Sequence, residues 1–331
     1  MNQYGHNFRI ALWGESHGPQ VGVTMDGVPA GLPLAEEDFA ADLARRRSGG
    51  RGTTPRREED RPQIVAGLYE GHTTGAPLTV LFTNGETRSQ DYAVLRDHFR
   101  PSHADRVAGL KSGGWNDPRG GGHFSGRLTV ALVAAGVVAK KMLPAEVRFQ
   151  TRLTEIGGCT DPERFDEVIT AAAAARDSVG GIVECCAEGV PAGLGEPFFD
   201  SAESLIAHLL FAIPAVKGVE FGSGFAAARL RGSENNDPIL DAAGHTATNH
   251  DGGINGGITN GNPLVVRAAL KPTPSIGLRQ MTFNRAAGRI EPLEIPGRHD
   301  VCVALRGAVV VEAAVAIALA DLLGGAPCQN R

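Results

Sequence analysis

A repetition within the chain constrains the fold more than any other feature of the sequence. The six residues 27–32, Gly-Val-Pro-Ala-Gly-Leu, recur without change at 189–194, which is 162 positions later. A second pattern, G-x-T-x-G-x-P-L, occupies residues 71–78 and again 257–264. Both patterns recur in the same order and at a long spacing. They therefore indicate two related halves and not a solenoid, whose repeats have a period of about 20–50 residues.

Two His-Asp segments extend this correspondence. Residues 100–105 read Arg-Pro-Ser-His-Ala-Asp, and residues 297–300 read Gly-Arg-His-Asp. Each segment precedes an alanine- and valine-rich stretch that predicts a long helix, near residues 128–142 and 309–323. We expect the halves to pack across a pseudo-twofold axis, so that both His-Asp segments reach the cleft between them.

The apolar pattern predicts the fold class. Short β-branched runs adjoin the repeated motifs, and no G-x-G-x-x-G follows the first strand. This favours antiparallel strands in an α+β arrangement of layers over a Rossmann fold. We expect a single domain over residues 1–331, with halves at about 1–145 and 180–325.

The ends of the chain and its cysteines favour a cytoplasmic protein. Residues 1–8 are polar and lack the basic-then-apolar order of a signal peptide. The apolar run 307–323 is interrupted by Glu312 and Asp321, which favours a helix buried inside protein over a membrane span. The five cysteines show no C-x-x-C spacing, so we expect reduced thiols and neither a disulfide framework nor a metal site.

The basic residues are almost all arginines, 27 against 5 lysines, in a chain of net charge −5. A guanidinium binds phosphate or carboxylate through two parallel hydrogen bonds, although a GC-rich genome also raises the arginine count. Seven arginines lie between residues 45 and 61, in a Gly- and Ser-containing stretch suited to closing over an anion. A solvated loop and an RNA-binding segment are the alternatives. The negative net charge and the lack of aromatic residues in the stretch disfavour RNA.

Other segments carry groups suited to proton transfer on an anionic substrate. His17 lies between glycines on an expected turn after strand 9–13, and the ordinary pKa of an imidazole lies near neutrality. Glycines 120–122 precede an expected helix start, where backbone N–H groups favour phosphate, and Arg127 adds a guanidinium. Each segment alone also fits a purely structural turn. No zinc-peptidase or Walker motif is present.

Taken together, these segments resemble the chorismate synthase family over nearly the full length of the chain. The resemblance rests on GESHG at 14–18, RRR at 45–47, RPSHAD at 100–105, AVKGVE at 215–220, KPT at 271–273 and GRHD at 297–300. It implies a β-α-β sandwich protomer and a homotetramer. It also implies the conversion of 5-enolpyruvylshikimate 3-phosphate into chorismate and phosphate by an anti-1,4 elimination, which requires reduced FMN without net redox change.

The resemblance assigns roles to individual residues. It implies that His17 protonates the leaving phosphate, that His103 serves the reduced flavin, and that Asp300 assists deprotonation at flavin N5. The residues expected to hold the phosphate and the two carboxylates of the substrate are Arg46, Arg51, Arg100, Arg127 and Arg298. The residues expected against FMN are His123, Phe124, Ser125, Gly256, Lys271, Pro272, Thr273, Pro274, Ser275 and Arg298. An external flavin reductase is the expected partner; nucleic acid and membrane are not.

One segment departs from the family pattern. Residues 123–127 read His-Phe-Ser-Gly-Arg, where the family usually has Arg-Ser-Ser-Ala-Arg. The change removes one cation and one hydroxyl beside the expected flavin. It leaves open an alternative function, in which a diverged paralogue with an altered flavin site acts on another phosphorylated ring acid.

Overall fold

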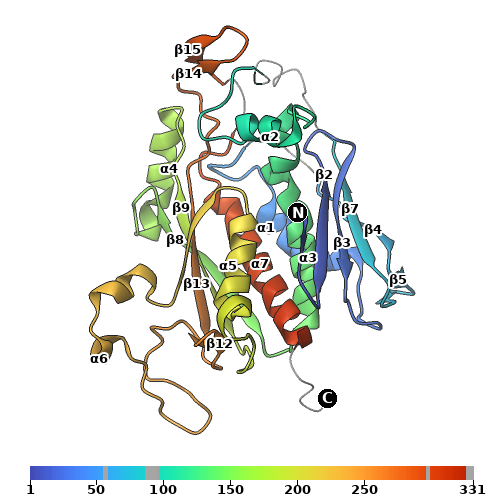
Figure 1. Ribbon diagram of the computed structural model, residues 1–331, viewed down its shortest axis with the longest axis vertical. Coiled ribbons are helices and arrows are strands. Elements are labelled where there is room, and N and C mark those ends of the chain that lie inside the picture. Colours follow the sequence, from blue (N-terminus) through green and yellow to red (C-terminus); the bar gives the residue numbers. More distant parts are fainter. Residues whose placement is uncertain (55–58, 86–94, 96, 296–298, 326–331) are drawn as a thin grey trace.

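Two antiparallel β-sheets enclose a layer of helices (Figure 1). The computed structural model describes residues 1–54, 59–85, 95, 97–295 and 299–325. The arrangement confirms the predicted α+β class and the β-α-β sandwich. The helices of the middle layer are α1 (Ala40–Arg46), α3 (Thr129–Met142), α5 (Ala202–Ala212) and α7 (Ala304–Gly325).

The first sheet has the order β1-β2-β3-β7-β4 and the second has the order β10-β13-β9-β8. The strands of the first sheet are β1 (Gln3–Tyr4), β2 (Arg9–Gly14), β3 (Gln20–Asp26), β4 (Gln63–Ala66) and β7 (Leu78–Thr83). Those of the second are β8 (Arg148–Ile156), β9 (Gly181–Glu188), β10 (Val216–Phe221) and β13 (Leu264–Leu270). Every second residue of β13 is buried, which is the pattern of a strand that packs one face on helices.

The remaining elements are short and lie outside these layers. The helices are α2 (Asp105–Ser112), α4 (Phe165–Ala174) and α6 (Gly232–Asn235). The strand pairs are β5 (Leu68–Tyr69) with β6 (His72–Thr73), β11 (Ile254–Asn255) with β12 (Ile258–Thr259), and β14 (Gln280–Asn284) with β15 (Arg289–Leu293).

The two sheets share one topology. Four strands of the first sheet lie in the order β2-β3-β7-β4, and the second sheet, followed from its β8 edge, has the order β8-β9-β13-β10. When the four strands of each sheet are numbered by their order along the chain, both sheets have the spatial order first, second, fourth, third. This agreement supports the duplication. The expected second half, about 180–325, leaves out β8, so we propose halves of about 1–145 and 148–325.

The repeated sequence motifs contact each other in the same way in both halves. Thr73 Oγ1 donates to the carbonyl oxygen of Pro29 at 2.6 Å and accepts from the N–H of Leu32 at 3.0 Å. Thr259 makes the equivalent bonds to the prolyl carbonyl and leucyl N–H of residues 189–194, at 2.7 and 2.9 Å. Both threonines are buried. In each half, the threonine of the G-x-T-x-G-x-P-L motif therefore satisfies two backbone groups of the Gly-Val-Pro-Ala-Gly-Leu motif. This pairing explains why the two motifs recur together.

We predict that Thr73→Val and Thr259→Val destabilise the protein by similar amounts. Valine keeps the shape but leaves a partly buried carbonyl and a partly or fully buried N–H unsatisfied, which costs about 1–3 kcal/mol. Urea unfolding of each variant measures this cost. Thr74→Val, at an exposed neighbouring threonine, is the control and should change the free energy of unfolding by less than about 0.5 kcal/mol. A cost confined to one half would contradict the equivalence.

Helix α7 lies at the centre of the molecule and packs closely on α3. A Cβ placed on Gly136 of α3 would lie 2.4 Å from the Cβ of Ala313, so the glycine permits this close approach. Helix α7 is long and apolar enough to cross a bilayer, but it lies between the two sheets and most of it is buried. This confirms the expectation of a helix buried inside protein.

The two acidic residues of α7 are both buried and both satisfied. Glu312 accepts two hydrogen bonds from Arg45 of α1, at 2.8 and 2.7 Å, and pairs with Lys140 of α3. Asp321 accepts from three consecutive backbone N–H groups, those of residues 6–8. Glu312 therefore joins the three central helices, and Asp321 fixes the chain just before β2.

The ion pairs of Glu312 should make stability depend on pH. Burial alone raises the pKa of Glu312, but the bonds to Arg45 and Lys140 outweigh it and hold the pKa at about 2. A carboxyl whose pKa is lowered by folding stabilises the protein above its unfolded pKa, and this stabilisation is lost as the pH falls toward 2.

We predict that Glu312→Gln lowers the free energy of unfolding at pH 7 by about 1.5–3 kcal/mol, because Arg45 and Lys140 lose one charged hydrogen-bond partner and keep the other, Asp42. The difference from wild type should shrink as the pH falls from about 5 toward about 2. Urea unfolding across this pH range tests both points. Glu167→Gln, which removes the exposed pair with Arg164, serves as the control. A difference that stays constant with pH would contradict the assignment.

Candidate active site

A cavity of about 950 Å³ lies where the two halves meet, and its wall contains most of the predicted site residues. These are Arg46, Arg100, His103, His123, Phe124, Ser125, Arg127, Lys271, Thr273, Pro274, Ser275 and Asp300. Its lining also includes apolar side chains of β2, α3 and α5, such as Ile10, Leu132 and Leu209. Segments far apart in the sequence therefore form one wall, as the cleft between the halves predicts.

Some predicted residues do not line this cavity. His17 is one of them: its ring packs against Gly120, which does line the cavity. Gly256 lies in the turn between β11 and β12, and Pro272 is the one residue of 271–275 that does not contribute to the wall. Arg51 lies on the surface, where it pairs with Asp166 of α4 at 3.0 Å. Arg298 lies outside the described residues.

The glycine turn of residues 119–124 lies between the two predicted histidines. A Cβ on Gly120 would lie 2.5 Å from Cδ2 of His17, and a Cβ on Gly121 would lie 3.3 Å from Cε1 of His103. Gly120 lines the cavity, and His17 is buried against it. Both glycines have positive φ, at 60° and 85°, which an L-residue with a Cβ rarely adopts. Glycine is therefore required here by conformation and by space.

The expected helix start at these glycines is wrong in its position. Residues 119–124 form an irregular 3₁₀ turn, and α3 begins only at Thr129. The intervening Ser125 caps a second short turn, where its Oγ accepts from the N–H of Arg127. His123 Nδ1 lies 2.8 Å from the carbonyl oxygen of Gly14 and joins the glycine turn to the end of β2. The 3₁₀ turn Gly126–Leu128, capped by Ser125, therefore separates the glycines from the start of α3.

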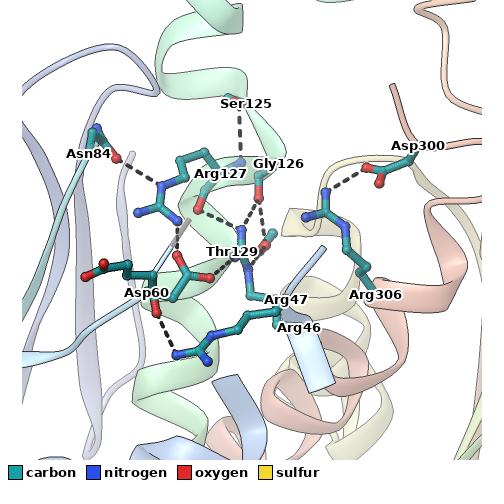
Figure 2. Close-up of polar contacts among 11 residues, drawn as sticks. Arg46, Arg47, Asp60, Asn84, Ser125, Gly126, Arg127, Thr129, Asp300 and Arg306 are labelled. Carbon is teal, nitrogen blue, oxygen red and sulfur yellow. Dashed lines mark hydrogen bonds and ion pairs between the residues drawn. The ribbon is translucent and has the colours of Figure 1, made fainter. Parts of the chain in front are cut away.

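A buried carboxylate joins two of the predicted arginines (Figure 2). Asp60 Oδ2 accepts from Arg46 at 2.9 Å, and Asp60 Oδ1 pairs with Arg127. All three side chains are buried. Arg127 is held further by Asn84 Oδ1, which accepts from its Nε at 2.9 Å. The carboxylate keeps two guanidinium groups together at the cavity wall, where they would otherwise repel each other.

The protein itself uses most of the hydrogen-bonding capacity of Arg46. Its Nε donates to Thr129, one Nη1 hydrogen goes to Asp60, and Nη2 donates to the carbonyl oxygens of Gly126 and Arg127. Burial lowers the pKa of Arg46 to about 10, despite the attraction of Asp60. Four of its five N–H groups are engaged, so at most one remains to contact a substrate.

Asp300 occupies the other side of this wall (Figure 2). Its Oδ2 accepts from Arg306 Nη2 at 2.6 Å, and its Oδ1 accepts from the backbone N–H of Thr54 at 2.9 Å. Arg306 belongs to the first turn of α7, whereas Thr54 belongs to the loop that follows α1. Asp300 therefore ties the arginine-rich loop of the first half to the second half.

His103 and Arg100 share a carboxylate as well. Asp105 accepts from Arg100 Nε at 2.8 Å and from Arg100 Nη2 at 2.7 Å. His103 Nδ1 lies 2.7 Å from Asp105 Oδ1. Arg100 Nη1 donates to Ser275 Oγ at 3.0 Å, so the chain of contacts reaches the segment expected at the flavin.

Sequence reasoning missed several residues of the wall. Asp60 lies among other acids in a loop whose sequence also fits a solvated surface. Arg306 lies just before the helix predicted at 309–323 and belongs to no recognised motif. His299 belongs to the quoted GRHD segment, but no role was predicted for it; burial and the nearby Arg100 lower its pKa. Its Nε2 is buried and has no hydrogen-bond partner among the described residues.

Comparisons with known proteins agree with this geometry. The sequence model of the family described as chorismate synthase matches residues 8–323. A chorismate synthase of Chitinophaga pinensis is 60% identical over 323 residues, which cover 98% of this chain and 96% of the relative. One of Dehalococcoides mccartyi is 46% identical over 351 residues, covering 97% of this chain and 96% of the relative.

A solved structure is also similar. It is described as a crystal structure of chorismate synthase, and its sequence is 28% identical to this chain. The matched region covers 97% of this chain and 92% of the solved chain, with a TM-score of 0.72. The match of the family model over nearly the whole chain and the 60% identity to a full-length relative determine the assignment. The chain belongs to the chorismate synthase family.

Proposed function

We propose that this cavity carries out the family's reaction, in which 5-enolpyruvylshikimate 3-phosphate loses phosphate by an anti-1,4 elimination and becomes chorismate. The observation that carries the proposal is the convergence of His17 and His103 on one glycine turn beside a cationic wall. An elimination of phosphate needs a positive environment for the leaving group and a positioned proton donor. Both requirements are present at one place.

The charge of the wall suits a substrate with one phosphate and two carboxylates. The charged side chains of the described lining are Arg46, Arg100, Arg127, Lys217, Lys271, Arg306, Asp60 and Asp300. Cations outnumber carboxylates by six to two, so the wall keeps a net positive charge after its internal ion pairs are counted. We assign Arg127 and Lys271 to the anionic groups of the substrate, with Arg46 and Arg100 holding the wall in shape.

The cavity also fits a flavin. Its volume of about 950 Å³ lies in the range of small-molecule sites. Thr273 Oγ1 and His299 Nε2 are buried in its wall without a hydrogen-bond partner in the described part of the chain, so they suit a polar ligand. We propose that reduced FMN binds against Ser125, Lys271 and Thr273 to Ser275. When bound, it supplies electron density to the allylic C–O bond that breaks.

We assign the proton-transfer roles from this geometry. We assign protonation of the departing phosphate to His17, which is buried against Gly120 of the cavity wall, and service of the reduced flavin to His103, which lines the cavity beside Gly121. Asp300, oriented by Arg306 and by the N–H of Thr54, is assigned to the path of the proton that leaves the ring. These roles are the ones that the family resemblance implies.

The changed segment 123–127 does not favour a diverged paralogue. His123 has a structural role in this chain, because its Nδ1 contacts the carbonyl oxygen of Gly14. The full-length relative at 60% identity also carries the name chorismate synthase. We therefore retain the family reaction and, as further parts of the proposal, a homotetrameric assembly, a cytoplasmic location and an external flavin reductase.

The assay that tests the proposal is chorismate formation under anaerobic conditions with photoreduced FMN. We expect chorismate and phosphate to appear in equal amounts, with no net consumption of reduced flavin. Omitting the reduction step should abolish turnover. Folded protein that binds FMN but releases no phosphate from this substrate would contradict the proposal and revive the paralogue.

A second prediction concerns the glycine turn. Gly120→Ala places a Cβ 2.5 Å from the ring of His17, so the ring must move, and we expect turnover to fall by about 100-fold. The matched control is Gly113→Ala at the end of α2, where φ is 61° and no atom lies within 4 Å of an added Cβ. This control carries the same backbone cost of about 1–2 kcal/mol but should keep its turnover. Equal losses in both variants would refute the importance of the clash.

A further inference from the structure

The contacts of Asp105 determine which nitrogen of His103 carries a hydrogen. Nδ1 of His103 lies 2.7 Å from Oδ1 of Asp105, whereas the N–H of Asp105 and Nη2 of Arg100 lie farther away, at 3.2 and 3.1 Å. A carboxylate oxygen only accepts, so a contact of 2.7 Å requires a hydrogen on Nδ1. The two longer contacts would need Nδ1 to be an acceptor, and that would bring two lone pairs together at the shortest distance.

The other nitrogen of His103 is then the one available to a ligand. The Cε1–Nε2 edge of the ring lies against Gly121, where an added Cβ would be 3.5 Å from Nε2. Nε2 makes no hydrogen bond within the part of the chain that the structure describes, and His103 lines the cavity. A ring whose Nδ1–H is held by a carboxylate presents an unprotonated Nε2 to its surroundings.

Asp105 is itself held firmly. Arg100 binds both of its carboxylate oxygens, and Arg100 is anchored in turn to Ser275 of the opposite half. Burial raises the pKa of Asp105, but the bonds from Arg100 and His103 outweigh it and hold the pKa far below its usual value. The carboxylate therefore stays charged throughout the physiological range. Its side chain and that of Arg100 are almost completely buried.

We propose that Asp105 is a positioning residue that fixes the Nδ1–H tautomer of His103, so that Nε2 is the atom that exchanges protons in the cavity. The catalytic part of this inference rests on the role of His103 in the proposed function. The arrangement also changes the role of Arg100, since its guanidinium serves to orient Asp105 rather than to hold the substrate.

The proton balance is simple. Neutral His103 accepts one proton at Nε2 and becomes an imidazolium, whose Nδ1–H remains hydrogen-bonded to the Asp105 carboxylate. Loss of that proton from Nε2 restores the starting tautomer, and Asp105 itself is never protonated. The charged or titratable groups around His103 are Asp105, Arg100, His299 and Lys271, which bonds the carbonyl of Ser102.

Nitrogen NMR of protein labelled with ¹⁵N-histidine tests the tautomer directly. The signals of His103 are assigned by their loss in His103→Gln. We expect neutral wild-type protein to carry the hydrogen on Nδ1. Asp105→Asn should shift the population toward Nε2–H, because the asparagine N–H can donate to Nδ1. In the same variant kcat should fall by about 10- to 100-fold, as for other residues that orient a functional histidine, with a smaller change in KM.

Two further variants separate this role from a general effect on folding. Asp105→Glu keeps the carboxylate and should restore the Nδ1–H signal in part. Asp97→Asn removes an exposed carboxylate that pairs with Arg285 and should change neither the His103 signals nor kcat. Wild-type His103 with its hydrogen on Nε2 would overturn the proposal. The expected tautomers with unchanged turnover would uphold the positioning by Asp105 and instead refute the proposed role of His103.

Discussion

The pairing of buried guanidinium groups with buried carboxylates is the interaction on which the cavity depends. A substrate with three anionic groups needs several cations at one wall, but unpaired cations repel one another and are costly to bury. Asp60 resolves this for Arg46 and Arg127, Asp105 for Arg100, and Asp300 for Arg306. Each carboxylate also comes from a different segment, so the same bonds that permit the charge fix the loops. The wall is thus preorganised for an anion before one arrives.

Glycine at residues 120–122 is the second constraint, and it acts through the absence of side chains. The turn separates two histidines and still lets both rings lie close to its backbone. Any Cβ at Gly120 would occupy the place of the His17 ring, and the positive φ disfavours other residues independently. Two independent causes therefore require glycine at position 120: the space that the His17 ring occupies, and the positive φ of the backbone.

The sequence allowed the framework to be predicted better than the cavity wall. Residues 71–78 and 257–264 repeat because a buried threonine must satisfy a particular turn, so a local pattern encodes a long-range contact. The two long apolar stretches, near residues 128–142 and 309–323, predicted α3 and α7 for a similar reason. The roles of Asp60 and Asp105 could not be predicted, because an acid near arginines in sequence fits a solvated loop equally well. Only burial, which depends on the tertiary structure, distinguishes the two cases.

The two halves differ in one connection that contributes to the site. In the second half, residues 213–215 connect α5 directly to β10, whereas in the first half residues 47–62 connect α1 to β4 and contribute Thr54 and Asp60 to the wall. The shared topology provides two sheets and a rigid helical layer, held by Glu312 at its centre. A longer connection on such a framework can carry polar groups without disturbing the core. The shared framework therefore positions the cavity, and the longer connection adds the groups that hold Asp300, Arg46 and Arg127 in the wall.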